Sequence, residues 1–114
     1  YELAQAAGLG VRVEKEKIVV EDCVREICDY FSIDPYASIS EGTLIIACRQ
    51  HKAQEVVETL GRKGVRSSIA GQLIEADKGM VLVEAGQEKE LEHPIVDPFW
   101  NAFYQALQGN IPPP

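Results

Sequence analysis

The residues of this chain best suited to chemistry lie between Ile33 and Arg49, where Ser40, Glu41 and Gly42 directly precede the apolar run Leu44 to Cys48. A carboxylate at the start of a buried strand can point into a cleft. There it can hold an ammonium, amide or hydroxyl group of a ligand, or a water molecule on a bound cation. An ordinary solvated turn carboxylate is the alternative, and the spacing leaves both readings open.

Asp34 stands at the other end of the same stretch, before Pro35. An aspartate in this position commonly caps a local turn. The substrate-binding candidates of the chain are therefore Glu41, Ser40, Gly42 and Asp34.

Other residues that often perform catalysis or bind metals stand alone in this sequence. His51 and His93 each lack a second ligand at metal-binding spacing, so no metal site is expected. The three cysteines have no paired spacing and are expected as free thiols packed like small hydrophobic residues, which indicates a reducing, cytoplasmic setting. Ser67 and Ser68 lie in a predicted strand without a nucleophile elbow, and no glycine-rich phosphate loop is present. No catalytic residue can be named with certainty.

Composition predicts an acidic domain with a core of its own. The chain has 114 residues, 46% of them hydrophobic, and a net charge of -7. The acidic balance disfavours nucleic acid and anionic membrane surfaces as partners, because both require a cationic face. We expect one domain over residues 1–109 and a tail over 110–114. The chain begins with Tyr1 rather than Met and opens within a predicted helix, which indicates a fragment of a longer protein.

Hydrophobic periodicity and turn residues predict four helices and several strands. The helices are expected at 1–7, 21–31, 51–62 and from Asp97 to Gly109, the last with an aspartate cap and Pro98 at its first position. Strands are expected at 11–13, 18–20, 36–39, 44–48, 65–75, 79–85 and 87–91, with a hairpin turn at Asp77 to Gly79. The Leu44 to Cys48 strand should be buried on both faces. This order predicts an α+β fold with a mixed, mainly antiparallel sheet flanked by helices.

The last predicted helix carries four aromatic residues on too wide an arc to face one core surface. Either most of them are core, with Trp100 or Tyr104 at the rim, or they contact another domain or subunit. On the second reading, the interface candidates are Trp100, Phe103 and Tyr104, and the helix is expected to mediate self-association.

The central stretch resembles a segment of the PurM-like, AIR synthase-related proteins. The matching residues are Ile33, Asp34, Pro35, Ser40, Glu41, Gly42, Leu44 and Ile45. Residues 1–20 are similar to the start of the family's second domain, and residues 53–71 are similar to its following helix and strand. The resemblance covers nearly residues 1–95, and its nearest branch is the HypE-like hydrogenase maturation proteins.

That resemblance implies a cytoplasmic, ATP-dependent enzyme of two domains, which activates an amide, acyl or carbamoyl oxygen by phosphorylation. The N-terminal domain would bind ATP with magnesium and form a homodimer. This chain would be the PurM C-terminal-like domain that closes the cleft, with Glu41 beside the nucleotide or acceptor, and would bind no cofactor alone. Its implied partners are its own N-terminal domain, a second copy and other maturation proteins.

The end of the chain departs from the HypE-like branch. Members of that branch end in Pro-Arg-Ile-Cys, whose cysteine accepts the carbamoyl group, whereas this chain ends in Asn110 followed by Ile-Pro-Pro-Pro. A second hypothesis is therefore a non-catalytic module that binds a small molecule or a protein. An upstream domain with clustered aspartates in the gene would favour the enzyme hypothesis.

Overall fold

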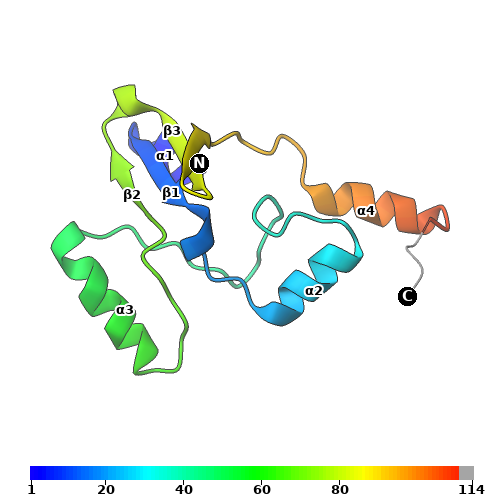
Figure 1. Ribbon diagram of the computed structural model, residues 1–114, viewed down its shortest axis with the longest axis horizontal. Coiled ribbons are helices and arrows are strands. Elements are labelled where there is room, and N and C mark those ends of the chain that lie inside the picture. The colour runs from blue at the N-terminus through cyan, green and yellow to red at the C-terminus, as the bar shows by residue number, and fades with distance from the viewer. Residues whose placement is uncertain (111–114) are drawn as a thin grey trace. The chain divides into compact units, whose positions relative to one another are not determined.

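The computed structural model describes residues 1–110 and divides the chain into two compact units (Figure 1). The sheet unit comprises Tyr1–Val19 and Ile46–His93. The helical unit comprises Val20–Ile45 and the stretch from Pro94 onward. A single domain over residues 1–109 stays a prediction. Of the predicted tail, residues 111–114 lie outside the described part of the chain.

The sheet unit is built on four strands in the order β2-β1-β3-β4. The strands are β1 (Gly10–Glu14), β2 (Gly71–Ile74), β3 (Met80–Glu84) and β4 (Gln87–Glu90). β1 pairs antiparallel with β2 and parallel with β3, and β3 pairs antiparallel with β4. The predicted α+β class with a mixed, mainly antiparallel sheet is confirmed.

The predicted hairpin across Asp77 to Gly79 is wrong, because β1 lies between β2 and β3. The connecting 3-10 turn, Ala76–Lys78, instead crosses the start of β1, where Val11 N donates to Gly79 O at 3.1 Å. A Cβ atom at Gly10 would lie 2.4 Å from Gly79 O and 2.7 Å from Glu75 O. Glycine at this position therefore permits the crossing. The residues Asp77 to Gly79 predict a turn from local sequence alone. The strand that lies between β2 and β3 is β1, which is far away in the sequence.

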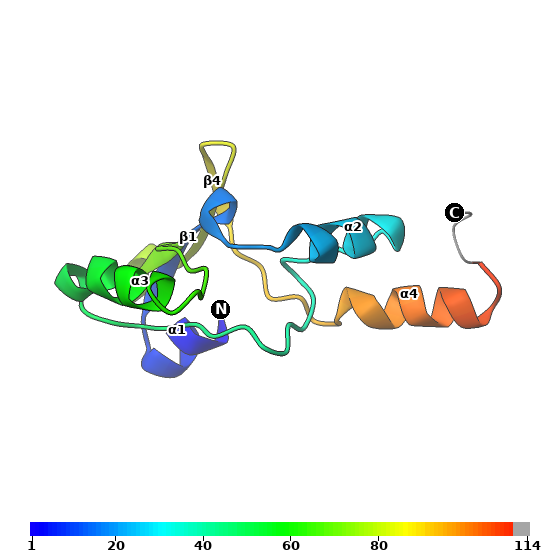
Figure 2. The ribbon, with the colours of Figure 1, turned by 90° about the horizontal axis from the view of Figure 1, so that it is seen from below.

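The β3–β4 hairpin matches the predicted strands and turns through Ala85 and Gly86, both with positive φ. In Figure 2 its turn projects away from α1 (Glu2–Ala7) and α3 (Ala53–Gly61). The charged stretch at 14–17 holds this turn from the side, because Glu16 Oε1 accepts a hydrogen bond from Ala85 N at 2.7 Å.

The predicted helices are confirmed in place. α1 ends at Gly8, which has φ 66. α2 spans Asp22–Tyr30, and α3 follows a short 3-10 turn at Gln50–Lys52. α4 spans Pro98–Leu107, with Asp97 as its cap. Within the described residues, no helix has the length and hydropathy needed to cross a bilayer.

The apolar run Leu44 to Cys48 is not a strand, which contradicts the sequence prediction. Leu44 is 78% exposed and Ile45 74% exposed. Strand propensity is local, whereas a ladder requires a neighbouring strand, and no described backbone group donates to or accepts from this run. The predicted strands at 18–20 and 36–39 are also absent, and the one at 65–75 is reduced to β2.

The core is much smaller than composition predicted. Within the described residues only two hydrophobic side chains are buried, Ala4 and Val83. The cysteines are free as expected, but Cys23 and Cys48 are exposed, so their predicted packing is wrong. Many large apolar side chains of both units are therefore exposed.

Candidate functional site

The candidate residues Ser40, Glu41 and Gly42 form an exposed turn in the helical unit. The hydroxyl oxygens of Ser40 and Thr43 share a hydrogen bond of 2.5 Å across this turn. Gly42 has φ 92, in the region that favours glycine, and open space surrounds the position of a Cβ atom there. The turn therefore presents the Glu41 carboxylate to solvent, and the role of Glu41 in binding stays a prediction.

Asp34 organises the start of the same segment. Its side-chain Oδ1 accepts from Tyr36 N at 2.9 Å, and its carbonyl accepts from Ala37 N and from Ser38 Oγ, each at 3.1 Å. These bonds form the local turn that an aspartate before proline favours. Ser67 and Ser68, predicted as ladder residues, lie outside the strands, so that prediction is wrong.

Asp97 joins this segment to α4, a role that sequence reasoning missed. Its Oδ1 accepts from Phe99 N at 2.9 Å as the helix cap, and its Oδ2 accepts from Ile39 N at 3.3 Å. One carboxylate thus fixes the residue before Ser40 beside the start of the aromatic helix. The cap was readable in the sequence, but the second bond spans 58 residues.

Arg25 of α2 reaches the same segment. Its hydrogen bond with Tyr36 raises the pKa of Arg25 above the usual value for arginine. The turn at Asp34 is therefore held by its own backbone and by a side chain from α2. Nothing in the spacing of Arg25 and Tyr36 indicated this pair.

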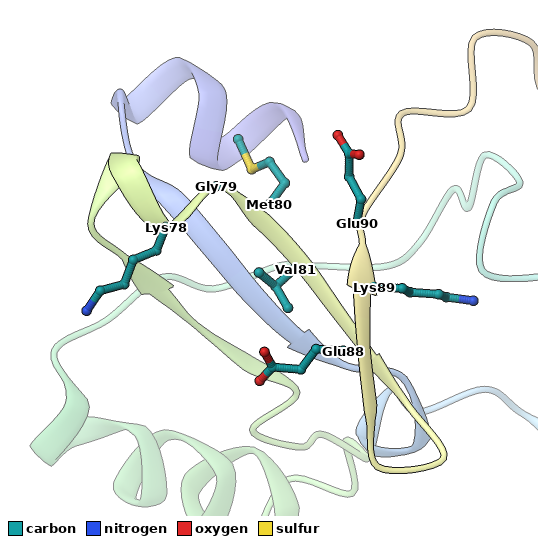
Figure 3. A pocket seen from close by; sticks show the side chains of 7 residues that line it. All are labelled: Lys78, Gly79, Met80, Val81, Glu88, Lys89 and Glu90. Carbon is teal, nitrogen blue, oxygen red and sulfur yellow. The ribbon is translucent and has the colours of Figure 1, made fainter.

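A shallow depression of about 370 Å³ lies on the sheet unit over β3 and β4 (Figure 3). Figure 3 shows Lys78 and Lys89 pointing away from each other at its sides. Lys78 pairs with Glu75 at 3.0 Å, Lys89 pairs with Glu84, and Glu88 accepts from Arg12 at 3.1 Å. Three of the four charged side chains that line the depression are therefore paired with neighbouring residues, and Glu90 is the fourth.

Glu84 is the most perturbed carboxylate of the sheet unit. Hydrogen bonds from Lys15 and Lys89 lower its pKa from the ordinary 4.5 to about 2. A hydrogen bond from Ala85 N likewise lowers the pKa of Glu16. These contacts fix the β3–β4 turn against residues 15–17, and we interpret them as structural.

The described residues contain no group of three histidine, cysteine, aspartate or glutamate side chains that could hold a metal ion. His93 lies 3.4 Å from a carboxylate oxygen of Glu2 and edge-on to the ring of Tyr1. This histidine therefore takes part in contacts that hold the start of α1.

The interface candidates are exposed on α4. The aromatic side chains of the helix are 41–57% exposed and contact one another, with Phe99 and Phe103 stacked at 5.8 Å between centroids. The reading in which most of them form core is wrong. The side chains that are less exposed are Pro98, Ala102 and Ala106.

Comparison with known proteins agrees with this fold. The chain is 27% identical over 99 residues to a protein of Methanocaldococcus jannaschii named for hydrogenase expression/formation, of which it covers 30%. It is 28% identical over 101 residues to the carbamoyl dehydratase HypE of Escherichia coli, again covering 30%. The crystal structure of E. coli HypE, a hydrogenase maturation protein, matches 89% of this chain with a TM-score of 0.73 at 27% identity, over 33% of that protein.

The family match defines which part of such a protein this chain represents. The alignments with these two curated relatives include 85–86% of this chain, but the chain spans less than a third of the length of either relative. Residues 1–92 match the C-terminal domain of the AIR synthase related proteins. α4 begins at Pro98, beyond that match. The resemblance read from the sequence is thus confirmed: the chain belongs to the AIR synthase related family and carries its C-terminal domain.

Proposed function

We propose that this chain is the substrate-side, cleft-closing domain of an ATP-dependent, cytoplasmic enzyme that activates an amide, acyl or carbamoyl oxygen by phosphorylation. The observation that carries the proposal is the match of residues 1–92 to the C-terminal domain of the family. A curated relative is named carbamoyl dehydratase. Removing a carbamoyl oxygen requires that it first become a good leaving group, which phosphorylation achieves.

Magnesium and ATP are assigned to the preceding part of the protein. The described residues form no metal-binding cluster, and the sequence has no glycine-rich phosphate loop. The residues of this chain therefore do not by themselves fit Mg-ATP. Their proposed share of the mechanism is to bind and orient the acceptor through the turn at Ser40, Glu41 and Gly42.

The partner implied by this division of labour is the N-terminal domain of the same protein, in a homodimer. The side chains of Leu44 and Ile45 support it, because they follow the candidate turn closely and are 78% and 74% exposed. Apolar area of this kind gains roughly 25 cal/mol per Å² when it is buried. Other maturation proteins remain proposed partners on the strength of the relatives' names alone.

Calorimetry tests the assignment of the nucleotide. The isolated chain is expected to show no binding heat when titrated with Mg-ATP, whereas the protein extended by its N-terminal domain should bind it. Tight, stoichiometric binding by this chain alone would contradict the division of labour.

Glu41 is tested in the full protein by following phosphate release with a panel of amide, acyl and carbamoyl compounds. Glu41→Gln should lower kcat/KM at least roughly tenfold, which corresponds to about 1.4 kcal/mol of transition-state stabilisation. The matched control is Glu26→Gln, since Glu26 is also exposed and lies in the same unit. Equal activity of both variants would remove Glu41 from the site.

A protein-interaction role is the second candidate, favoured by the exposed aromatic side chains of α4. The two candidates differ in what precedes the chain in its gene. An upstream domain with clustered aspartates supports the enzyme, and an unrelated upstream sequence supports the interaction module.

A further inference from the structure

The aromatic side chains of α4 form a continuous apolar surface. Phe99, Trp100, Phe103 and Tyr104 are 46%, 48%, 41% and 57% exposed, and Leu107 is 68% exposed. α4 makes few contacts with α2, the other α-helix of the helical unit. The small side chains of Ala102 and Ala106 occupy its more covered side, so the bulky ones are left facing solvent.

The rings of this surface contact one another. Trp100 lies edge-on to Phe103 at 6.0 Å between centroids, and Phe103 lies edge-on to Tyr104 at 5.7 Å. Rings that already contact one another lose little side-chain freedom when a partner covers them. The Asp97 cap fixes the start of the helix in addition.

Charge decides what kind of partner fits. The chain carries a net charge of -7, yet no charged residue occurs from Pro98 to the last residue. A basic partner would find no carboxylate to pair with on this helix. Two copies of an acidic chain repel each other over most of their surface, but a neutral apolar helix is complementary to itself.

The exposed area fits a weak dimer. With about 150–250 Å² for a whole aromatic side chain, the exposed parts of the four rings and of Leu107 amount to roughly 500 Å² per copy. A pair would bury about 1,000 Å², the lower limit for a specific interface. An interface of this size belongs to the weak class, so we design the test for a dissociation constant on the order of 10–100 µM.

We propose that α4 is a homodimerisation helix, which packs against α4 of a second copy of this chain in an isologous, antiparallel pair. Phe99, Phe103 and Leu107 form one ridge at four-residue spacing, and Trp100 and Tyr104 form the next. Ridges of this spacing on two copies interdigitate. Because α4 lies beyond the family match, the proposed dimerisation does not depend on the proposed enzymatic function, and each can fail without the other.

Sedimentation velocity tests the proposal on the chain between about 5 and 500 µM, concentrations that bracket the expected dissociation constant. We expect a monomer at the low end and a dimer at the high end, with the emission of Trp100 shifting to shorter wavelength over the same range. Raising the salt concentration should strengthen the dimer, because salt screens repulsion between acidic copies while the helix contact has no charge to lose. A dimer weakened by salt, or a monomer throughout, would overturn the proposal.

Variants locate the interface. Phe103→Ser and Tyr104→Ser should each raise the dissociation constant at least tenfold and move the shift of the Trp100 emission to correspondingly higher concentrations. The matched control is Ile95→Ser, because Ile95 is 93% exposed and lies just before the helix but outside it. Circular dichroism confirms that each variant keeps its helix content. A dimer that survives Phe103→Ser with unchanged affinity, in a variant that is still folded, places the interface elsewhere and refutes the proposal.

Discussion

The backbone N–H of Ile39 donates to Oδ2 of Asp97 at 3.3 Å, while Oδ1 of the same carboxylate caps α4 through Phe99 N at 2.9 Å. One side chain therefore couples the segment that carries the candidate turn to the helix that carries the aromatic surface. Both contacts lie inside the helical unit. A change at Asp97 should consequently affect both features together.

Asp97→Ala should destabilise the helical unit by about 1 kcal/mol, the usual cost of losing a helix cap. Asp97→Asn should cost less, since asparagine also caps helices well. Chemical denaturation followed through the emission of Trp100 measures both changes. Asp77→Asn, in the 3-10 turn of the sheet unit, is the control. If alanine and asparagine at position 97 have equal effects, the cap does not stabilise α4.

The two outcomes at Asp97 show what sequence can and cannot predict. The cap and Pro98 are adjacent in the chain, so the start of α4 was predicted from local chemistry. The bond to Ile39 depends on how distant segments meet, which no pattern within either segment specifies. The same limit explains the hairpin predicted at Asp77 to Gly79, since the turn formed but β1 lies between the two strands.

The candidate site likewise combines features that local sequence predicts with one that it does not. The turn at Asp34 and the positive φ of Gly42 follow from residue type and were readable in the sequence. The exposure of Leu44 to Cys48 was not readable, because a β-forming sequence becomes a buried strand only when a partner covers it. The family resemblance could be recognised from residue identities, whereas the exposure of this run could not.

Gly10→Ala should destabilise the sheet unit by about 1–3 kcal/mol, as inserted atoms do in a tightly packed site. Its new Cβ atom would meet the carbonyl oxygens of Gly79 and Glu75 at 2.4 and 2.7 Å. Gly61→Ala is the control, because a Cβ atom there meets nothing within 4 Å. That change should be neutral or stabilise α3 by about 0.5–1 kcal/mol. Thermal unfolding compares the two variants, and equal midpoints would contradict the crossing described for β1.

The stability of the β3–β4 turn should depend on pH through Glu84. Its folded pKa of about 2 lies below the ordinary 4.5, so its stabilising contribution is present above about pH 4.5 and is lost as the pH falls toward 2. NMR titration of the Glu84 carboxyl carbon measures the pKa directly. Lys15→Met and Lys89→Met should each raise it, and Lys78→Met, whose lysine pairs with Glu75, should not. A Glu84 midpoint near 4.5 in the unaltered chain would rule out this pairing.

Substitutions in the exposed run at Leu44 to Ile46 distinguish the stability of this chain from its proposed contact with an N-terminal domain. Leu44→Ser and Ile45→Ser should change the unfolding free energy of the isolated chain by less than about 0.5 kcal/mol, since exposed side chains lose little when shortened. In the two-domain protein the same changes should each cost about 1–3 kcal/mol, because the proposed N-terminal partner buries these side chains. Paired denaturation curves of the short and long proteins measure the difference.

The control is Val83→Ala. Because Val83 is only 8% exposed, this substitution should destabilise both the short and the long protein. Equal, small effects of Leu44→Ser in both proteins would show that the N-terminal domain does not cover this run, and the proposed domain contact would then have to lie elsewhere.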